Sequence, residues 1–465
     1  MATNLPDYVS LAKPNPAENR AAWWKNTAQT YAGIMLWFVF WQSIPTGDAA
    51  LPGGMLGCGV ATAIAAIFVS AFLCYLLFYL APAMLGMKSG LSLTVVGTST
   101  YGTTGGFLMP GFLMGVLQFG WLAVNAYFSG LLLAGAFGME EMSSVHLIIA
   151  SLWAIAAAFI GLKGIKYVAP IASFLPLIPV VILIVLLAKT SGGIAEFDQK
   201  ELVTQQQTLT EGAKTAGAST YGVFNILGLY ILGFFATAGA AGCNMGTANR
   251  NRYDVHMGGL VGVFGATLFA ATLSLLVYAG AYGSGILAYD APLGNTPSIM
   301  GAIMGNDKIG SIFMTLLAVS AFPSACFAAL IAADNIKTTL PKINPFITCG
   351  IGTLAAIALI LSGKAGQAAA VFTVIGASFG PICGAMTADY ILSGFRWNGP
   401  RAGFNPAGWI SWLVGFVVGA FNFIECRPFD MPCPPLLAFV VGFVLYFLLA
   451  KMGLESKSLE MKSKG

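Results

Sequence analysis

Long apolar segments alternate with short polar loops along almost the whole chain. Each apolar segment is near or above the ~20 residues that an α-helix needs to cross the hydrocarbon layer of a bilayer. The ~10-residue segments of alternating hydrophobicity that are typical of a membrane β-barrel are absent. The pattern therefore predicts an all-α polytopic membrane protein with about twelve transmembrane helices. The predicted spans cover residues 27–45, 55–85, 106–137, 145–162, 167–188, 223–248, 258–284, 308–333, 344–362, 367–393, 405–426 and 433–451.

Composition supports this class, and the distribution of cations indicates an orientation. Hydrophobic residues make up 57% of the chain and charged residues 9%, and the mean hydropathy is +0.80, whereas a soluble domain carries roughly 25% charged residues. Most of the 22 Lys and Arg residues fall on the inner side if the N-terminus is placed in the cytoplasm, as the positive-inside rule requires. We therefore expect a protein of the cell membrane with both termini cytoplasmic. The net charge of +4 belongs to these loops and does not indicate a nucleic-acid partner.

The order of the spans predicts how the chain is divided. The N-terminal residues are mostly polar and lack the apolar core of a cleavable signal peptide, and no loop is large enough to fold as a soluble domain. The expected regions are a cytoplasmic tail (1–26), a first five-helix repeat (27–188), an extracytoplasmic loop (189–222), a second five-helix repeat (223–393), two additional transmembrane helices (394–451) and a cytoplasmic C-terminal tail (452–465).

The third predicted span carries polar side chains in an otherwise apolar sequence. At about 100° per residue, Gln118 and Asn125 fall within about 20° of each other on a helix, and Trp121 lies about 60° away. Polar groups inside a membrane must find partners, and they mark functional sites there. Two amides beside an aromatic plane suit a flat, hydrogen-bonding ligand, so this face is the first candidate for a substrate site.

The first and sixth predicted spans contain residues that can interrupt a helix. Gln42, Ser43 and Pro45 follow apolar residues in the first span, and the sixth contains the glycine-rich segment 233–242. Interrupted spans in corresponding positions of two halves indicate a transporter with inverted repeats. Here they predict a five-plus-five arrangement with two extra helices. The alternative is that these glycines only let helices pack closely.

The charged residues fall almost entirely at span ends or in loops, and no carboxylate lies mid-membrane as a proton relay would. A coupling cation would then be held by backbone carbonyls and hydroxyls, which favours Na⁺ over H⁺. In the eighth span Ser320 and Ser324 are spaced i, i+4, with Pro323 beside the second. The alternative is that each hydroxyl bonds back to its own helix. The sequence contains no motif of an enzyme, a nucleotide-binding loop or a Cys/His metal site, so we expect a protein that is not an enzyme.

Two of the eight cysteines differ from the others in their position. Most lie in spans, where a thiol is a small apolar filler, but Cys426 and Cys433 flank the loop between the last two spans, on the predicted outer side. A disulfide is chemically permitted there, and free thiols remain the alternative.

In several passages the sequence resembles the nucleobase–cation symporter-1 family, the group of the bacterial cytosine permease and the hydantoin transporter. Each passage is short, but their order and spacing extend over nearly the whole membrane region. The passages are Gly90–Leu93, Tyr101–Gly106, Gln118–Trp121, Gly233–Thr237, Gly380–Gly384, Thr387–Tyr390 and Asn405–Trp409.

The resemblance implies a leucine-transporter-type fold with a substrate cavity between a bundle and a scaffold, and transport by alternating access. It implies that Trp121 and Phe235 stack on the two faces of a planar heterocycle. Gln118, Asn125, the carbonyl of Gly233 and the hydroxyl of Thr237 would bond its edge. The size of the pocket would depend on how Trp121, Phe235 and Gln42 pack.

The chain departs from the family's pattern in two places. One hydroxyl of the sodium-binding pair in the eighth span is missing or moved, and Asn244 stands where an aspartate is expected after the sixth-span break. If sodium binds, the resemblance implies the carbonyls of Leu36 and Phe40 and the hydroxyl of Ser320 as its ligands.

We therefore expect a secondary active transporter that imports a nucleobase or a related cytosine- or purine-like heterocycle, by cation symport and with no cofactor other than a coupling Na⁺. Its partners would be this small molecule and membrane lipid, without an obligate protein partner. Two alternatives are a carrier of amino acids or other small amines on the same fold, and a non-transporting membrane sensor or channel.

Overall fold

The structure is a computed structural model of the chain. Gln42 and Phe40, two residues of the expected sites, lie outside the described residues, and for Leu36 only the backbone is described. The described residues are 5–37, 41, 44–45, 52–207, 220–291, 296–340 and 342–460.

The described chain folds into α-helices, some of which are joined end to end by π-helical turns. These turns are η5 (Cys74–Tyr79) between α4 and α5, η6 (Phe107–Phe112) before α9, and η8 (Gly259–Gly265) between α15 and α16. The α-helices are α1 (Asp7–Ser10), α2 (Thr27–Tyr31), α4 (Val60–Leu73), α5 (Leu80–Ser89), α6 (Leu93–Val96), α7 (Thr98–Tyr101), α8 (Thr103–Gly106), α9 (Leu113–Ala136), α10 (Ser144–Lys163), α11 (Ile165–Phe174), α12 (Leu177–Thr190), α13 (Gln199–Gln207), α14 (Thr220–Gly246), α15 (Arg252–Gly258), α16 (Ala266–Gly283), α17 (Thr296–Met304), α18 (Asp307–Thr339), α19 (Pro345–Leu361), α20 (Ala368–Leu392), α21 (Pro406–Gly419) and α22 (Pro434–Lys451).

These helices confirm the predicted membrane-spanning pattern. Nine segments of the described residues are long and apolar enough to span a bilayer, and α19 and α21 are shorter apolar helices. Together they coincide with every predicted span from the second to the twelfth. Of the first span, 27–45, the structure describes α2, a 3-10 turn η3 (Ile34–Leu36) and a few isolated residues.

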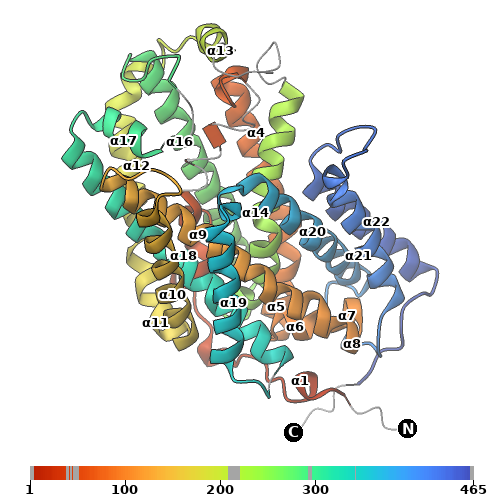
Figure 1. Ribbon diagram of the computed structural model, residues 1–465. Coiled ribbons are helices and arrows are strands. Elements are labelled where there is room, and N and C mark those ends of the chain that lie inside the picture. The colour runs from red at the N-terminus through yellow and green to blue at the C-terminus, as the bar shows by residue number, and fades with distance from the viewer. Residues whose placement is uncertain are drawn as a thin grey trace.

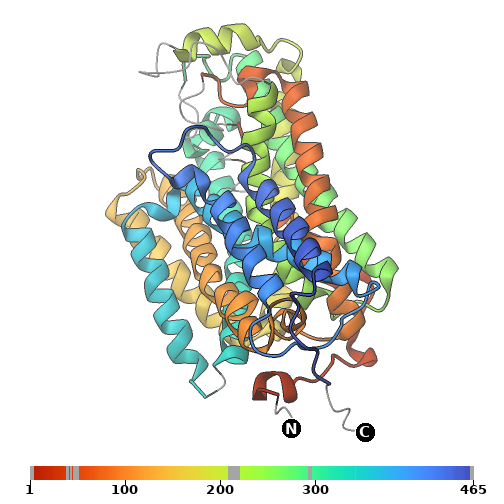
Figure 2. The same cartoon turned by 90° about the vertical axis from the view of Figure 1, so that its right-hand side faces the viewer.

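The helix α14 is the most buried of the described membrane-spanning helices. In its apolar segment 83% of the residues are buried inside the protein, compared with 33% in α10, so α14 lies at the centre. It packs along α4, α5 and α20, while α9 packs along α18, α10 and α19. The helices α20, α21 and α22 pack against one another and lie on the side that faces the viewer in Figure 2. Both α1 and the described C-terminal segment lie at one end of the molecule, and α13 lies at the opposite end (Figure 1). We call the first of these the terminal end.

Part of the predicted loop 189–222 is a packed helix. In α13, Leu202 is fully buried. The side-chain amide of Gln199 donates to the carbonyl of Gly57 (2.8 Å), and that of Gln206 donates to the carbonyl of Ala291 (2.8 Å). The helix α13 therefore packs onto the end of the molecule opposite the terminal end.

The N-terminal segment, expected only as a polar tail, is bound to the helices. Val9 is fully buried, and the phenol of Tyr8 donates to the carbonyl of Thr103. Burial raises the pKa of the Tyr8 phenol, so the phenol keeps the proton that it donates. The backbone N–H of Asn15 donates to the carbonyl of Gly90 (2.8 Å), and its side chain donates to that of Thr247 (2.9 Å). The segment therefore lies across the terminal ends of α5 and α14.

A buried ion-pair network joins α20 to the C-terminal segment. The guanidinium of Arg401 contacts Asp389 (3.1 Å) and Glu455 (2.7 Å), and the side chains of Arg401 and Asp389 are 3% and 4% exposed. The hydroxyls of Ser99 and Thr100 donate to the second carboxylate oxygen of Asp389, at 2.6 and 3.0 Å. Because every member has a partner, this network holds α7, α20 and the last described residues together.

The beginning of the first span lies in close contact with the π-helical turn η8. The N–H of Gly33 donates to the carbonyl of Gly262 in η8 (2.8 Å). A Cβ atom added to Gly262 would lie 1.6 Å from the carbonyl oxygen of Gln29. Only glycine fits at this contact.

Gly262→Ala is therefore expected to destabilise the protein by about 1–3 kcal/mol or more, because the two backbones would have to separate. The thermal unfolding midpoint of the purified protein in detergent measures this. Gly350→Ala is the matched control, since Gly350 lies in α19 with nothing within 4 Å of the added Cβ, and we expect an unchanged or slightly higher midpoint. Equal midpoints for both variants would contradict this close contact.

Cys426 and Cys433 are both free thiols in the structure. A Cβ atom added to Gly228 of α14 would lie 2.5 Å from the sulfur of Cys433. Cys433 therefore packs against α14, and Cys426 is exposed.

Candidate functional site

A cavity lies between α9, α14 and α18, with part of the first span at its edge. Its empty volume is about 550 Å³, including space open to solvent. None of the described residues that line it is charged. The lining residues are Ala32, Met35, Gln118, Trp121, Asn125, Phe234, Thr237, Ala238, Ala241, Met245, Ser324, Phe327, Ala328 and Ile331.

The structure brings together four residues of the predicted site. Gln118, Trp121 and Asn125 lie on one face of α9 and line the cavity, as their helical spacing predicts. Thr237 of α14 lines the same cavity. All four are buried. The structure therefore places these four side chains at one cavity, and their role in binding a ligand stays a prediction.

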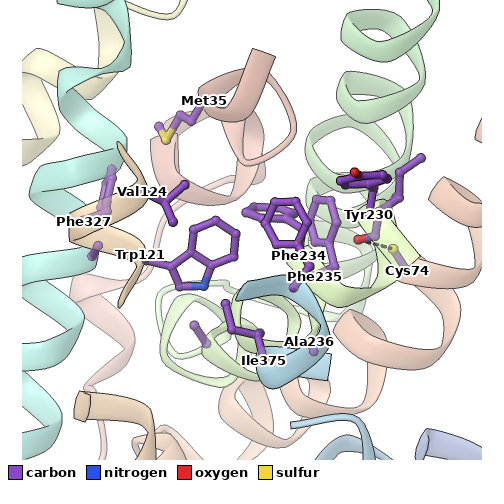
Figure 3. Close-up of a cluster of buried hydrophobic side chains, with 14 of the residues drawn as sticks. Met35, Cys74, Trp121, Val124, Tyr230, Phe234, Phe235, Ala236, Phe327 and Ile375 are labelled. Carbon is purple, nitrogen blue, oxygen red and sulfur yellow. Dashed lines mark hydrogen bonds between the residues drawn. The ribbon is translucent and has the colours of Figure 1, made fainter. Parts of the chain in front are cut away.

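Trp121 is held by contacts on several sides. Its indole N–H donates to the hydroxyl of Thr237 (2.7 Å). The ring of Phe234 meets it edge-on, at 4.9 Å between centroids and 82° between planes (Figure 3). The ring of Phe372, from α20, lies at 5.4 Å and 34°. The orientation of the indole is therefore fixed by two aromatic rings and one hydrogen bond.

Phe235, expected to face Trp121, does not line the cavity. It is fully buried and contacts Phe234 at 4.6 Å between ring centroids. Successive residues on a helix point about 100° apart, so Phe234 and Phe235 cannot both face the same wall. Of the two rings, the one that lines the cavity is that of Phe234. Helical spacing from Thr237 contains this signal, since a residue three positions earlier shares its face.

The sixth span is a continuous helix and is not broken at its glycines. α14 extends from Thr220 to Gly246. A Cβ atom added to Gly233 would lie 2.8 Å from the carbonyl oxygen of Phe372, and one added to Gly239 would lie 2.7 Å from the backbone of Phe78. These glycines therefore permit close helix packing, which was the alternative interpretation of the sequence. Gly233 is not among the described residues that line the cavity. That its carbonyl bonds the edge of a ligand stays a prediction.

The two amides differ in how far their hydrogen bonds are already used. The side-chain N–H of Asn125 donates to the carbonyl of Trp121 (2.8 Å), and the hydroxyl of Ser324 donates to its oxygen. The side-chain N–H of Gln118 contacts only the sulfur of Met114 (3.4 Å), which is a weak acceptor. The carbonyl oxygen of Gln118 has no partner among the described residues. Gln118 is therefore the amide with the most capacity left for a ligand.

The structure describes one side chain of the expected sodium site. Ser320 is 1% exposed and its hydroxyl donates to the carbonyl of Leu317 in its own helix (2.7 Å). It does not line the cavity. The segment η3, which contains the backbone of Leu36, packs against α18. Among the described residues, no group of three or more His, Cys, Asp and Glu side chains could hold a metal.

A second, larger cavity continues toward the terminal end, with an empty volume of about 1350 Å³. Met245 and Ile331 line the first cavity, and the adjacent stretches of the same two helices, at Asn244 and Asp334, line the second. Asn244, which stands where the family resemblance implies an aspartate, accepts a hydrogen bond at its side-chain oxygen from the N–H of Leu93 (2.8 Å). The lining residues are Lys13, Pro14, Asn15, Pro16, Gly90, Ser92, Asn244, Thr247, Asp334, Asn335, Lys337 and Thr338. The N-terminal segment therefore covers a space between α14 and α18.

The sequence matches no model of a known protein family and no curated protein, but the fold is similar to solved structures. One is Mhp1, a nucleobase-cation-symport-1 family transporter, in a closed conformation with bromovinylhydantoin bound. It is 16% identical, with a TM-score of 0.63 over 96% of this chain and 95% of that chain.

Two further solved structures share the fold at similarly low sequence identity. A Na⁺-coupled sialic acid symporter in a substrate-bound outward-open state is 14% identical, with a TM-score of 0.57 over 98% of this chain and 93% of that chain. The manganese transporter of Eremococcus coleocola is 16% identical, with a TM-score of 0.53 over 93% of each chain. All three proteins are membrane transporters and not enzymes. The leucine-transporter-type fold expected from the sequence is confirmed.

Proposed function

We propose that this chain is a secondary active transporter of the nucleobase–cation symporter-1 type, and that it carries a neutral planar heterocycle. The observation that supports this most directly is the cavity in which Trp121, Gln118 and Asn125 of α9 meet Thr237 of α14. An aromatic plane beside amides matches a flat ring with donors and acceptors on its edge. The same fold holds bromovinylhydantoin in the structure of Mhp1.

The ligand would stack on Trp121 and bond through its edge to Gln118. Stacking of a base on an aromatic side chain contributes roughly 1–3 kcal/mol, and an amide left unpaired by a wrong ligand costs a similar amount. The absence of charged side chains among the described lining residues favours a ligand without net charge. Phe234 and not Phe235 supplies the second ring of this cavity, and it packs edge-on against Trp121 instead of facing it across the ligand.

A carrier of zwitterions is less consistent with the site. Such a carrier needs free backbone amides at a helix break to meet the carboxylate, and α14 is continuous where the break was expected. The described lining residues also include no cation that would pair with a carboxylate.

We propose Na⁺ as the coupling ion, with the carbonyls of Leu36 and Phe40 and the hydroxyl of Ser320 as ligands. Ser320 gives its hydrogen to Leu317, which leaves the lone pairs of its oxygen for a cation. The similar fold of a Na⁺-coupled sialic acid symporter supports this coupling. We also propose that the terminal end is cytoplasmic, in accordance with the distribution of Lys and Arg, so that the second cavity is the inner vestibule.

A thermal-shift screen of the purified protein tests the substrate class. We expect at least one of uracil, cytosine, hypoxanthine and adenine to raise the unfolding midpoint in a concentration-dependent way, because a ligand stabilises the state that binds it. The rise is expected to be larger with Na⁺ than with choline at equal ionic strength. Amino acids should produce no shift.

Uptake of the stabilising compound, in radiolabelled form, by cells that lack their own permeases then tests transport. A shift with amino acids and none with any heterocycle would overturn the proposal, and so would binding without saturable uptake.

A further inference from the structure

We propose that Ser324 of α18 is a positioning residue that fixes the side-chain amide of Asn125, and thereby determines whether the site prefers an oxo or an amino group on the ligand's edge. This inference rests on the proposed function, because it concerns the ligand of the same cavity. From the sequence, the hydroxyl of Ser324 is expected either to bind a cation or to bond back to its own helix. In the structure it lines the substrate cavity together with Asn125.

The orientation of the Asn125 amide follows from its two neighbours. An amide can be turned by 180° without a change of shape, so its oxygen and nitrogen are assigned from the hydrogen bonds that they make. One end of this amide lies 2.8 Å from the carbonyl oxygen of Trp121. A carbonyl oxygen only accepts, so the nitrogen must lie at this end. The oxygen of Asn125 therefore faces Ser324.

The hydroxyl of Ser324 has one hydrogen and two acceptors within reach. One is the carbonyl oxygen of Ala321 in its own helix (2.7 Å), and the other is the amide oxygen of Asn125. Its single hydrogen lies near both acceptors and is shared between them, as in a three-centre hydrogen bond. One of the two contacts joins α18 to the amide of Asn125 on α9, so the hydroxyl fixes Asn125 across the α9–α18 interface.

The fixed amide gives the cavity a defined pattern of donors and acceptors. Asn125 keeps one N–H and one lone pair for a ligand, and their positions cannot exchange without the loss of the bonds to both Trp121 and Ser324. Without Ser324, an exchange would lose only the bond to Trp121. One hydrogen bond is worth about 0.5–1.5 kcal/mol, so removal of the Ser324 hydroxyl is expected to reduce discrimination between oxo and amino rings about two- to twelvefold.

The test uses the full-length purified protein and pairs of probes that differ at one edge position, uracil with cytosine and hypoxanthine with adenine. Competition with a radiolabelled heterocycle gives the ratio of the two dissociation constants for each pair. We expect Ser324→Ala to bring the ratio closer to one, and Ser324→Thr, which keeps the hydroxyl, to preserve it. Thr315→Ala is the matched control, because this exposed hydroxyl of α18 bonds only within its own helix (2.8 Å).

A double-mutant cycle distinguishes positioning from direct contact with the ligand. In an Asn125→Ala background, Ser324→Ala should leave the ratio unchanged, since the amide that it orients is gone. A change of the ratio in that background, or equal weakening of both probes in Ser324→Ala alone, would overturn the inference.

A second readout does not depend on the ligand. Without added compound, the unfolding midpoints of the two single variants and of the double variant should be non-additive, because the residues share one hydrogen bond. If Ser324→Ala does not fold, Ser324→Cys, with its weaker donor, replaces it in both cycles. Wild-type protein that binds no probe would overturn the proposed function. Additive midpoints would overturn the positioning role alone.

Discussion

Replacement of Trp121 by alanine is expected to weaken binding of the heterocycle about 10- to 100-fold or more. The variant loses the stacking plane, worth roughly 1–3 kcal/mol, and leaves the hydroxyl of Thr237 without its donor. It also removes the ring against which Phe234 and Phe372 pack, so the remaining wall of the cavity loses its shape. Equilibrium binding of the radiolabelled compound to the purified protein measures the effect.

A conservative variant at the same position separates the two contributions. Trp121→Phe keeps a smaller aromatic plane and loses the N–H that donates to Thr237, so we expect an intermediate loss of affinity.

Trp412→Phe is the control outside the cavity. Trp412 in α21 likewise donates to a protein oxygen, the carbonyl of Ser378 (3.0 Å), and stacks on Phe416. This variant should bind as the wild type does. Binding by Trp121→Ala within twofold of the wild type would show that the ligand does not use this ring.

Replacement of Arg401 by methionine is expected to cause the largest loss of stability among single variants of the charged residues. The substitution leaves Asp389 as a buried carboxylate without its cation, and such a loss costs about 3–5 kcal/mol. The hydroxyls of Ser99 and Thr100 remain as donors to Asp389 but do not supply charge. We expect a clearly lower unfolding midpoint in detergent, and release of the C-terminal segment that Glu455 attaches.

The matched control is Arg427→Met. Arg427 also contacts an aspartate, Asp430 (2.6 Å), but these side chains are 32% and 76% exposed. An exposed pair contributes about 0–1 kcal/mol, so the control should unfold close to the wild-type midpoint. Asp389→Asn added to Arg401→Met should recover part of the loss, because it removes the unpaired charge. Equal midpoints for the Arg401 and Arg427 variants would contradict the role assigned to burial.

The described spans and the polar face of the third one were predictable because both depend on the local sequence. Apolar length sets the spans, and about 100° per residue places Gln118, Trp121 and Asn125 on one side of α9. The same rule, applied backward from Thr237, would have selected Phe234. The sequence contains two adjacent phenylalanines, and the resemblance to the family implied the second of them, Phe235.

Other features were not predictable, since they depend on which helix lies opposite. Whether the glycines of the sixth span break the helix or admit a neighbour was decided by Phe372 and Phe78, which pack against Gly233 and Gly239. Ser324 bonds to the carbonyl of Ala321 in its own helix and also to the amide of Asn125, and the second contact depends on the position of α9.

The amino-acid sequence by itself determined that this is a helical membrane protein with a buried face of two amides and an indole, because apolar length and helical period are properties of one segment. Only the tertiary structure decided that Phe234 meets this indole, that α14 is continuous, and that the N-terminal segment covers the second cavity. The physical reason is that a buried ring, a close glycine contact or a shared hydrogen bond has a defined energy only when its partner is in place.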